Sequence, residues 1–413
     1  MRNLTRRAFP GLVLLSSVLA ASCGGGGGGS SGSGSSTTPV AAATNTVAVV
    51  VDAGPESTTN PTVNTLYTTV TVCAPGSTTA CQTIDHIQVD TASYGLRVLA
   101  SALTVTLPVS TASDGNSLAE CTQFVDGYSW GPVAAADLQV GGESARSVPI
   151  QVIGDSSFAP VPAACAGTGT AEDTVATFGA NGILGIGVFA QDCGTACSSS
   201  AANTFYYSCS QSACNGVAAS LTSQVLNPVP LFAKDNNGTI LDLPSLASPG
   251  AATLTGTLIF GIDTETNNAS GTETVIGLDA NGNFSTTFIG TALTQSFVDS
   301  GTNGIFFNDS SLAPCTSSNF SGFYCPASSV NLSATITSNA TSTITATIDF
   351  TIDNAETVAN GNPSFSAIPG LGGTFPSSSS SFDWGLPFFF GRRVANAIQG
   401  YTTSAGSGPY VAF

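Results

Sequence analysis

Two short stretches of this chain share one pattern, and they constrain its fold more than any other feature. The first, V-D-T-A-S-Y-G-L, contains Asp90, and the second, V-D-S-G-T-N-G-I, contains Asp299. Each aspartate directly follows an apolar strand and precedes Ser or Thr, a small residue, and a second Ser or Thr. No other aspartate in the sequence begins such a run. The repeat predicts two lobes of similar topology, each delivering one equivalent loop.

Strand signals dominate the rest of the 413 residues. Short runs rich in β-branched residues, such as T-V-A-V-V-V and V-P-I-Q-V-I, are bounded by Gly, Pro, Asn or Ser. We also interpret L-T-V-T-L, residues 103–107, as a strand. Helical spacing is scarce, and we expect short helices at Ala218–Leu226 and Arg393–Gln399. The sequence therefore predicts an all-β protein with long loops.

The N-terminus predicts export. Three arginines precede an apolar run, Leu12–Ala21, that is too short for a stable membrane span. We therefore expect a signal peptide over residues 1–22. The stretch T-R-R-A-F also resembles a twin-arginine export signal.

A lipid anchor is expected next to the signal peptide. V-L-A-A-S-C resembles a bacterial lipobox, with Cys23 as the lipidated residue; the alternative is an ordinary cleaved signal with a chance cysteine. The Gly/Ser-rich stretch that follows cannot bury a core and predicts a flexible tether. We therefore divide the chain into a signal peptide, an anchor with its linker (23–44), an N-terminal lobe (45–230) and a C-terminal lobe (231–413).

The charge balance restricts the partners. The chain has 8 Lys and Arg against 25 Asp and Glu, for a net charge of −17, and three of the arginines lie in the signal peptide. Such a surface argues against nucleic acid and anionic lipid as ligands. We expect a monomer held in the bacterial cell envelope, on the periplasmic face or the outer membrane, with the lipid anchor as its sole membrane contact.

Cysteine usage agrees with export. Ten cysteines remain besides Cys23, and an even number in an exported chain predicts five disulfides. Cys73–Cys81 and Cys315–Cys325 are plausible pairs because each would close a small loop, whereas spacing does not resolve the four cysteines between 193 and 214. With one histidine in the chain, we expect no zinc. The loops at Asp235 and Asp279 lack full EF-hand spacing and are interpreted as turns, so no metal or cofactor is expected.

Two aspartates that meet at a pseudo-twofold axis would have a defined chemistry. Neighbouring carboxylates cannot both ionise, so the pair shares a proton and titrates as a unit. One carboxylate can deprotonate a water held between them while the other donates a hydrogen bond to a substrate carbonyl. This arrangement predicts general acid–base hydrolysis of an amide bond.

The motifs resemble those of the pepsin-like aspartic peptidases. D-T-A-S-Y-G-L-R-V resembles that family's D-T-G-S-S-N-L-W-V, and V-D-S-G-T-N-G resembles its V-D-[TS]-G-T-[ST]. Four further segments match in the family's order: N-G-I-L-G-I-G, A-D-L-Q-V-G-G, G-T-L-I-F-G-I-D and G-L-P-F-F-F-G-R-R. The likeness extends over residues 45–413, and the ending D-W-G-L-P-F-F-F-G-R resembles that of an uncharacterised group of bacterial lipoproteins.

The resemblance implies a bilobal pepsin-like fold, with two pseudo-twofold-related lobes and a central cleft. It implies that Asp90 and Asp299 are the catalytic pair. Thr91 and Ser300 would form a hydroxyl network that locks the loops, and Ser93 and Thr302 would be the outer hydrogen-bond partners of the carboxylates. The flap aromatic would be Phe124, Tyr128 or Trp130. The chain departs from the family at Ala92 and Pro387, where the family prefers Gly.

Two functions stand at this stage. The first is an envelope-tethered aspartic endopeptidase that cleaves peptides or unfolded proteins, and the second is a lipoprotein of the same fold that binds a peptide, protein or glycan without cleaving it. A glycosidase also uses paired carboxylates, but it does not need two matching loops and ranks third. His86 alternates with apolar strand residues and is interpreted as structural, and the chain lacks the G-x-S-x-G elbow of many serine hydrolases.

Overall fold

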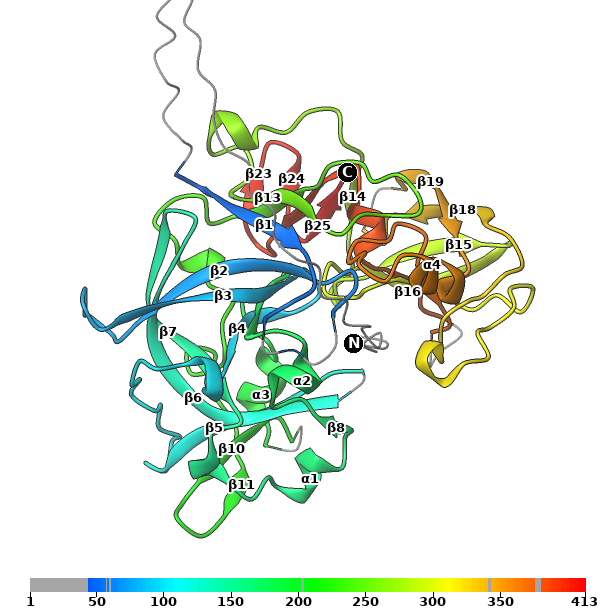
Figure 1. Ribbon diagram of the computed structural model, residues 1–413. Coiled ribbons are helices and arrows are strands. Elements are labelled where there is room, and N and C mark those ends of the chain that lie inside the picture. Colours follow the sequence, from blue (N-terminus) through cyan, green and yellow to red (C-terminus); the bar gives the residue numbers. More distant parts are fainter. Residues whose placement is uncertain are drawn as a thin grey trace, which may run out of the picture.

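The computed structural model describes residues 44–56, 58, 61–125, 127–201, 204–340, 343–375 and 380–413. Strands dominate, so the prediction of an all-β protein is confirmed (Figure 1). The signal peptide, Cys23 and the linker as far as residue 43 were predicted for residues that lie outside these ranges.

One large sheet contains strands from both halves of the chain. Sixteen of the described strands belong to it, in the order β11-β10-β5-β6-β7-β4-β9-β3-β2-β1-β13-β12-β22-β25-β14, with β8 paired to β6. Their bounds are β1 Thr46–Val51, β2 Leu66–Cys73, β3 Cys81–Asp90, β4 Tyr94–Leu99, β5 Ser117–Gln123, β6 Gly127–Val140, β7 Glu143–Ile153, β8 Thr170–Ala171, β9 Gly182–Ile186, β10 Tyr206–Cys209, β11 Cys214–Gly216, β12 Gly238–Asp242, β13 Leu254–Phe260, β14 Val275–Gly277, β22 Arg393–Ala397 and β25 Tyr410–Ala412.

A second sheet lies in the later half of the chain. Its order is β19-β18-β15-β16-β21-β17-β20, and a separate hairpin pairs β23 with β24. The bounds are β15 Phe284–Phe288, β16 Thr291–Val298, β17 Ile305–Phe306, β18 Val330–Thr337, β19 Thr345–Ile352, β20 Gly372–Gly373, β21 Asp383–Trp384, β23 Thr402–Thr403 and β24 Gly406–Ser407.

The helices are short. The α-helices are α1 Ala163–Ala166, α2 Val175–Phe178, α3 Thr195–Ser199 and α4 Ala355–Gly361, and the 3-10 turns are η1 Ala100–Ala102, η2 Ser156–Phe158, η3 Val229–Leu231, η4 Thr266–Asn268, η5 Ser318–Phe320 and η6 Leu386–Phe389. Among the residues that the structure describes, no helix has the length and apolar character needed to cross a membrane.

Three local predictions were wrong. Ala218–Leu226 forms turns instead of a helix. The Ala219 carbonyl, which a helix would pair with a backbone N–H, accepts a hydrogen bond from Gln224 Nε2 instead. Arg393–Gln399 was expected to be helical but supplies β22, which pairs with β12 and β25, so tertiary pairing overrides local spacing. The predicted strand at 103–107 is absent; this segment is an irregular connection.

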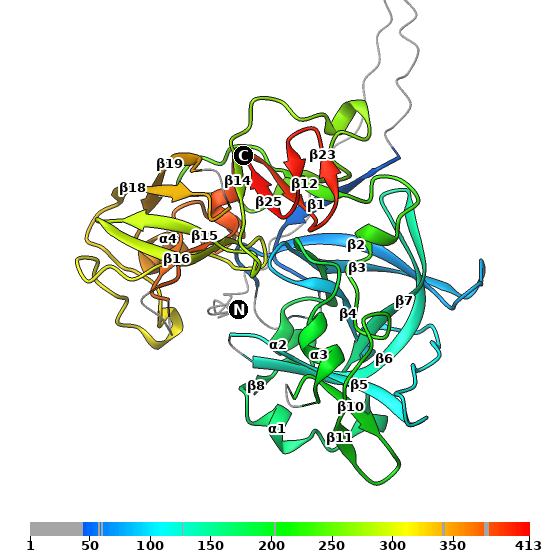
Figure 2. The same ribbon diagram turned by 180° about the vertical axis from the view of Figure 1, so that it is seen from behind.

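The predicted repeat is visible in the strand pairing. β3 runs parallel to β9 and β4 runs antiparallel to it, with Val89 opposite Leu184. In the later half, β16 runs parallel to β21 and β17 runs antiparallel to it, with Val298 opposite Trp384. Figure 2 shows β3 and β4 on one side of the middle of the molecule and β16 on the other. β3 ends at Asp90, and Asp299 directly follows β16.

The apolar core packs behind the loops. One buried cluster includes side chains from both halves, from Val49 to Val411. Trp384 stacks on Phe382 with ring centroids 4.4 Å apart, and Phe388, Phe389 and Phe390 are buried with it, as predicted for this aromatic segment. This burial supplies the main driving force for holding β16 and β21 in place.

Five disulfides are present, which confirms the prediction from the cysteine count. Both proposed pairs form, and the four cysteines that spacing left open pair with their nearest neighbours in sequence. The bonds are Cys73–Cys81, Cys121–Cys165, Cys193–Cys197, Cys209–Cys214 and Cys315–Cys325.

Candidate active site

The two motif aspartates converge on one glycine. Asp90 ends β3, Asp299 follows β16, and both side chains are fully buried. A methyl group placed on Gly301 would lie 2.2 Å from Asp90 Oδ2 and 3.0 Å from Asp299 Oδ1. The fold therefore brings the two carboxyl groups to the same point, and the lack of a side chain at Gly301 makes room for them.

Reciprocal hydrogen bonds lock the two loops together. The Ser300 N–H donates to Thr91 Oγ1 at 3.0 Å, and the Thr91 N–H donates to Ser300 Oγ at 3.2 Å. The Ser300 hydroxyl donates in turn to the Val89 carbonyl at 2.9 Å, and the Thr91 hydroxyl to the Val298 carbonyl at 3.4 Å. All four bonds are buried, so breaking one leaves a costly unsatisfied group. The structure thus places Thr91 and Ser300 between the loops.

The two carboxyl groups accept equivalent hydrogen bonds from the backbone, whereas the equivalent motif residues Ser93 and Thr302 make different side-chain contacts. The Ala92 N–H donates to Asp90 Oδ1 and the Gly301 N–H donates to Asp299 Oδ1, both at 2.7 Å. The Thr302 hydroxyl donates to Asp299 Oδ2 at 2.8 Å. The equivalent Ser93 hydroxyl makes no hydrogen bond with the described residues.

The position of Ser93 corrects one expectation. Its Oγ lies against Gly185 of β9, where a methyl group on that glycine would be 2.5 Å away. The hydroxyl is therefore directed at the neighbouring strand instead of at Asp90. Ser93 and Thr302 occupy equivalent places in the motif, but only the second serves as an outer partner among the described contacts.

Two amide side chains that the sequence analysis missed hold the second loop. Gln88 Nε2 donates to the Gly301 carbonyl at 2.8 Å. Asn64 Nδ2 donates to the carbonyls of Asn303 and Ile368, both at 2.8 Å, and Asn64 Oδ1 accepts the Ile368 N–H. Both side chains are buried and come from the first half of the chain. The available signal was a polar residue inside an apolar strand, I-Q-V, for Gln88.

A third carboxyl group lies beside the pair. Asp383 of β21 is 2% exposed, and the residues that follow it, Gly385 and Leu386, pack against the Thr302 carbonyl. Burial, and then the negative charges of Asp299 and Asp90, raise the pKa of Asp383 well above its ordinary value. The sequence analysis missed this residue, because Asp383 lies within an aromatic segment that was interpreted as core.

A buried ion cluster ties the first loop to the β5–β6 hairpin. Arg97 is 1% exposed, and its Nη2 lies 2.6 Å from Glu120 and 2.9 Å from Asp192. Arg97 also donates to the Tyr94 carbonyl at 2.9 Å and the Thr122 hydroxyl at 2.7 Å. Burial, and then the charge of Glu120, raise the pKa of Asp192 well above its ordinary value. Arg97 thereby links the residues after Asp90 to the hairpin.

The three candidate flap aromatics pack inside the first half. Phe124 lies in a buried cluster with Phe178, and the two ring centroids are 6.4 Å apart. Tyr128 and Trp130 lie in another buried cluster, where Trp130 makes an edge contact with Tyr207. The role of a flap over the aspartates stays a prediction for all three.

A small cavity adjoins the first loop. Its volume is about 210 Å³, and Thr91, Ala92 and Tyr94 line it together with Leu278 and Asn396 from the later half. The Asn396 amide is buried and makes no hydrogen bond with the described residues, so the cavity offers an unused donor and acceptor. Such a cavity is smaller than the roughly 300–1,000 Å³ typical of ligand pockets and suits one side chain.

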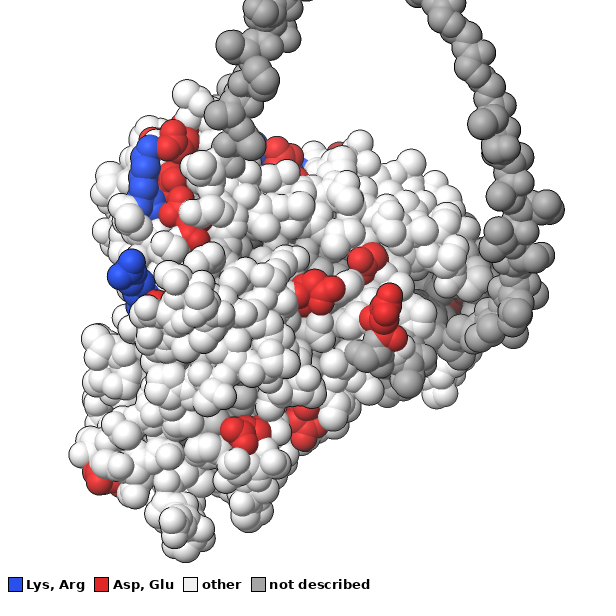
Figure 3. Space-filling model, turned by 60° about the vertical axis from the view of Figure 1, so that its left-hand side comes forward, with Lys and Arg blue, Asp and Glu red and all other residues white. Residues whose placement is uncertain are grey.

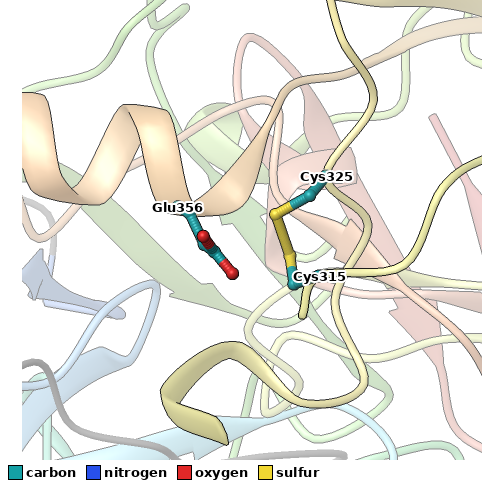
Figure 4. A group of neighbouring side chains, drawn as sticks. All are labelled: Cys315, Cys325 and Glu356. Atoms are coloured by element: carbon teal, nitrogen blue, oxygen red, sulfur yellow. A yellow bond between two sulfur atoms is a disulfide. The ribbon is translucent and has the colours of Figure 1, made fainter. Parts of the chain in front are cut away.

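One cluster has the geometry of possible metal ligands but a different chemistry. Cys315, Cys325 and Glu356 lie together (Figure 4), yet the two cysteines form a disulfide and offer no thiolate. Glu356 accepts the Ser317 N–H at 3.0 Å. These contacts describe a cross-linked loop docked on α4.

His86 lies away from the aspartate pair in a small charged group. Its Nε2 is 3.4 Å from Asp52, and its Nδ1 is 3.2 Å from Asp85. The hydrogen bond with Asp52 raises the pKa of His86. The interpretation of His86 as structural agrees with these contacts. Elsewhere on the surface, Asp and Glu side chains are spread over the face in Figure 3, where Lys and Arg are few.

The architecture defines a class of fold. A solved structure, the crystal structure of aspartic proteinase from Irpex lacteus, aligns with 89% of this chain and 96% of its own at a TM-score of 0.50 and 13% sequence identity. At that identity the likeness establishes the fold alone, so the chain has a pepsin-like fold, as predicted. Residues 41–413 match the family model described as "Protein of unknown function (DUF3443)", and the chain belongs to that family. A search of curated proteins gives no match.

Proposed function

We propose that the protein is an aspartic endopeptidase whose catalytic pair is Asp90 and Asp299. The observation that carries this proposal is the convergence of the two buried carboxyl groups on Gly301, within loops that lock each other through Thr91 and Ser300. A shared fold alone would not require two aspartates to meet in this way.

In the proposed reaction, an ionised carboxylate takes a proton from water while the water oxygen attacks the peptide carbonyl carbon. The neutral carboxyl gives its proton to the carbonyl oxygen, which forms a tetrahedral diol. The diol then returns a proton to the carboxylate that protonated the carbonyl oxygen. The carboxyl that took its proton from water gives that proton to the amide nitrogen, and the C–N bond breaks. Both carboxyl groups recover their starting states, and no covalent intermediate forms.

The proposed setting is the bacterial envelope, with Cys23 as a lipid anchor and an unfolded protein or peptide as substrate. The lipobox-like sequence supports the anchor, and the five disulfides suit an oxidising compartment. The strongly acidic composition argues against nucleic acid as a partner. We also propose that the protein acts as a monomer.

The test is cleavage of a denatured protein mixture by the purified protein, from acidic to neutral pH. Asp90→Asn and Asp299→Asn should each abolish cleavage without unfolding the protein, and a pepstatin-type inhibitor should block the wild type. Asp353→Asn is the matched control, because Asp353 is also buried but hydrogen-bonds with Ser248 and Ser329. A folded, disulfide-complete wild type that cleaves nothing would instead favour the second function, a lipoprotein that binds its ligand without hydrolysis.

A further inference from the structure

The cavity beside the first loop is lined by residues that flank both aspartates. The two residues after Asp90 line it, and so do the two residues before Asp299. Its remaining lining residues come from both halves of the chain, with an exposed end at Asn281 and a buried end at Asn396 and Val411. A side chain of a peptide held at the aspartates can therefore enter this cavity.

Asn396, at the buried end, is an unusual residue for its position. It lies on β22 between Ala395 and Ala397, is 1% exposed, and makes no hydrogen bond with the described residues through Nδ2 or Oδ1. Asparagine is disfavoured in strands, and a buried amide without hydrogen bonds costs free energy. Thr239 of β12, opposite it in the register, gives no relief, because the Thr239 hydroxyl is also buried without a hydrogen bond to the described residues. The cavity thus ends in an unused donor and acceptor.

The lining favours an uncharged polar group as the occupant. Among the described residues that line the cavity there is no Asp, Glu, Lys, Arg or His. A charged side chain would lose its hydration here without gaining a counter-charge, and an apolar one would leave the Asn396 amide unsatisfied. A primary amide carries both donors and an acceptor, so it can form two hydrogen bonds with the amide of Asn396. The matching side chains are those of asparagine and glutamine.

We propose that this cavity is a specificity subsite that takes a primary-amide side chain of the substrate, asparagine or glutamine, and pairs it with the amide of Asn396. This inference rests on the proposed peptidase function and names the substrate class of the same site. Peptide bonds are then cleaved at a fixed distance from an asparagine or glutamine residue. Asn396 selects and orients the substrate and neither gains nor loses a proton.

The first test is the cleavage profile of the purified protein on a denatured protein mixture, read by mass spectrometry of the fragments. The wild type should show asparagine or glutamine enriched at one fixed position relative to the cut. Asn396→Leu should still cleave, with leucine or methionine enriched at that position instead. Asn331→Leu is the matched control, because Asn331 is an exposed residue of β18 that bonds Thr351. A wild-type profile without this enrichment, or an unchanged profile in Asn396→Leu, would overturn the proposal.

The second test is kinetic and uses three synthetic peptides that differ only at the enriched position. Glutamine, methionine and glutamate have similar size there but differ in hydrogen bonding and charge; asparagine, leucine and aspartate form the set if asparagine is the enriched residue. In the wild type, kcat/KM should fall about 10- to 100-fold from the amide to the apolar peptide, and at least as far for the acidic one. In Asn396→Leu the apolar peptide should be preferred. Equal values for the amide and apolar peptides in the wild type would refute recognition by Asn396.

A purely structural role of Asn396 is tested without substrate. Since its amide has no partner among the described residues, Asn396→Leu should unfold at an equal or higher denaturant concentration than the wild type. Lower unfolding midpoints in both Asn396→Leu and the smaller Asn396→Val would show that the amide bonds within the protein, and would overturn the subsite. If Asn396→Leu alone is unstable, the cause is overpacking, and Asn396→Val takes its place in the cleavage tests.

These outcomes separate the subsite from the function on which it rests. A folded wild type that cleaves nothing would refute the peptidase and the subsite together. A wild type whose cleavage depends on Asp90 and Asp299 but shows no preference for an amide side chain would refute the subsite alone.

Discussion

The two aspartate loops make matching hydrogen bonds and have different neighbours. Each aspartate accepts the N–H two residues further on, and Thr91 and Ser300 exchange equivalent bonds. Beside the first loop, Arg97 is opposite Ile183, whereas beside the second, Phe306 is opposite Asp383. In the first half the charged residue of the facing pair is on β4 and the apolar one on β9. In the second half the charged residue is on β21 and the apolar one on β17. The comparison teaches that the motif fixes the meeting of the carboxylates, while residues outside it make the two sides chemically different.

The largest expected effect tests the charged side of the first loop. Arg97→Met would leave Glu120 and Asp192 in a buried site without their cation, at a cost of about 3–5 kcal/mol in unfolding free energy. Phe306→Leu, at the equivalent position, should cost less than about 1.5 kcal/mol. Denaturant unfolding of both variants measures the difference. Similar small losses would show that the Arg97 cluster does not anchor the first half.

The small residue of each motif gives the next effect. Gly301→Ala would push a methyl group against Asp90 Oδ2, so we expect a loss of about 1–3 kcal/mol in stability from overpacking. Misplacing the carboxyl groups by about 1 Å should also lower kcat/KM by about 100-fold. Ala92→Gly should leave most activity intact, because Ala92 already has room beside the cavity. Equal activity in both variants would contradict this asymmetry.

The outer hydroxyls allow a gentler comparison. Thr302→Val removes the donor to Asp299 and should cost about 1.5 kcal/mol, the low end for a hydrogen bond to a charged group. Ser93→Ala removes a hydroxyl that makes no hydrogen bond with the described residues and should be close to neutral. The unfolding midpoints of the two variants, compared with the wild type, test this. A larger loss for Ser93→Ala would indicate a bond that forms in solution.

The smallest effect is a change in the pH dependence of stability. The pKa of Asp383 is raised in the folded state. Its contribution to the free energy of unfolding is therefore fully present below its ordinary pKa of 3.8 and declines as the pH rises towards the folded pKa. Asp383→Asn should remove that decline, which denaturant unfolding at several pH values would reveal. An unchanged pH profile in Asp383→Asn would contradict the prediction.

Asp263 provides a control of opposite sign for this pH series. Burial alone would raise its pKa, but hydrogen bonds from Ser404 and Ser270 lower the pKa to about 2. Its contribution is therefore present above the ordinary pKa of 3.8 and is lost as the pH falls towards 2. Asp263→Asn should flatten the acid side of the stability curve, the opposite side from Asp383→Asn.

Sequence patterns were sufficient for the features that depend on local repetition. The paired motif located both loops, alternating apolar residues indicated the strands, and the cysteine count gave the five disulfides. The four cysteines between Cys193 and Cys214 stayed open, because their pairing depends on how the chain folds between them. Arg393–Gln399 was misread since an alternating segment of small residues also fits a helix until its partner strands are known.

The unpredicted site residues share one physical property: their partners are distant in sequence. Asn64 bonds Ile368, which is 304 residues away, and no local pattern marks such a contact. Asp383 matters because β21 returns beside Thr302, and Arg97 matters because β5 supplies Glu120. For Arg97 and Asp383, a charged residue inside an apolar strand was the visible signal, but its meaning depended on the fold.

The pairing of β1 with β13 also has a consequence for the order of synthesis. Asn45, just before β1, bonds the Phe260 carbonyl, 215 residues later in the chain. The last strand, β25, pairs with β22 and β14 in the same sheet. As the chain leaves the ribosome, β1 therefore emerges long before β13, and the sheet cannot close until the final residues have been made. The nascent chain must keep an apolar strand without its main partner until β13 has been made, which exposes it to aggregation and makes a chaperone useful at this stage.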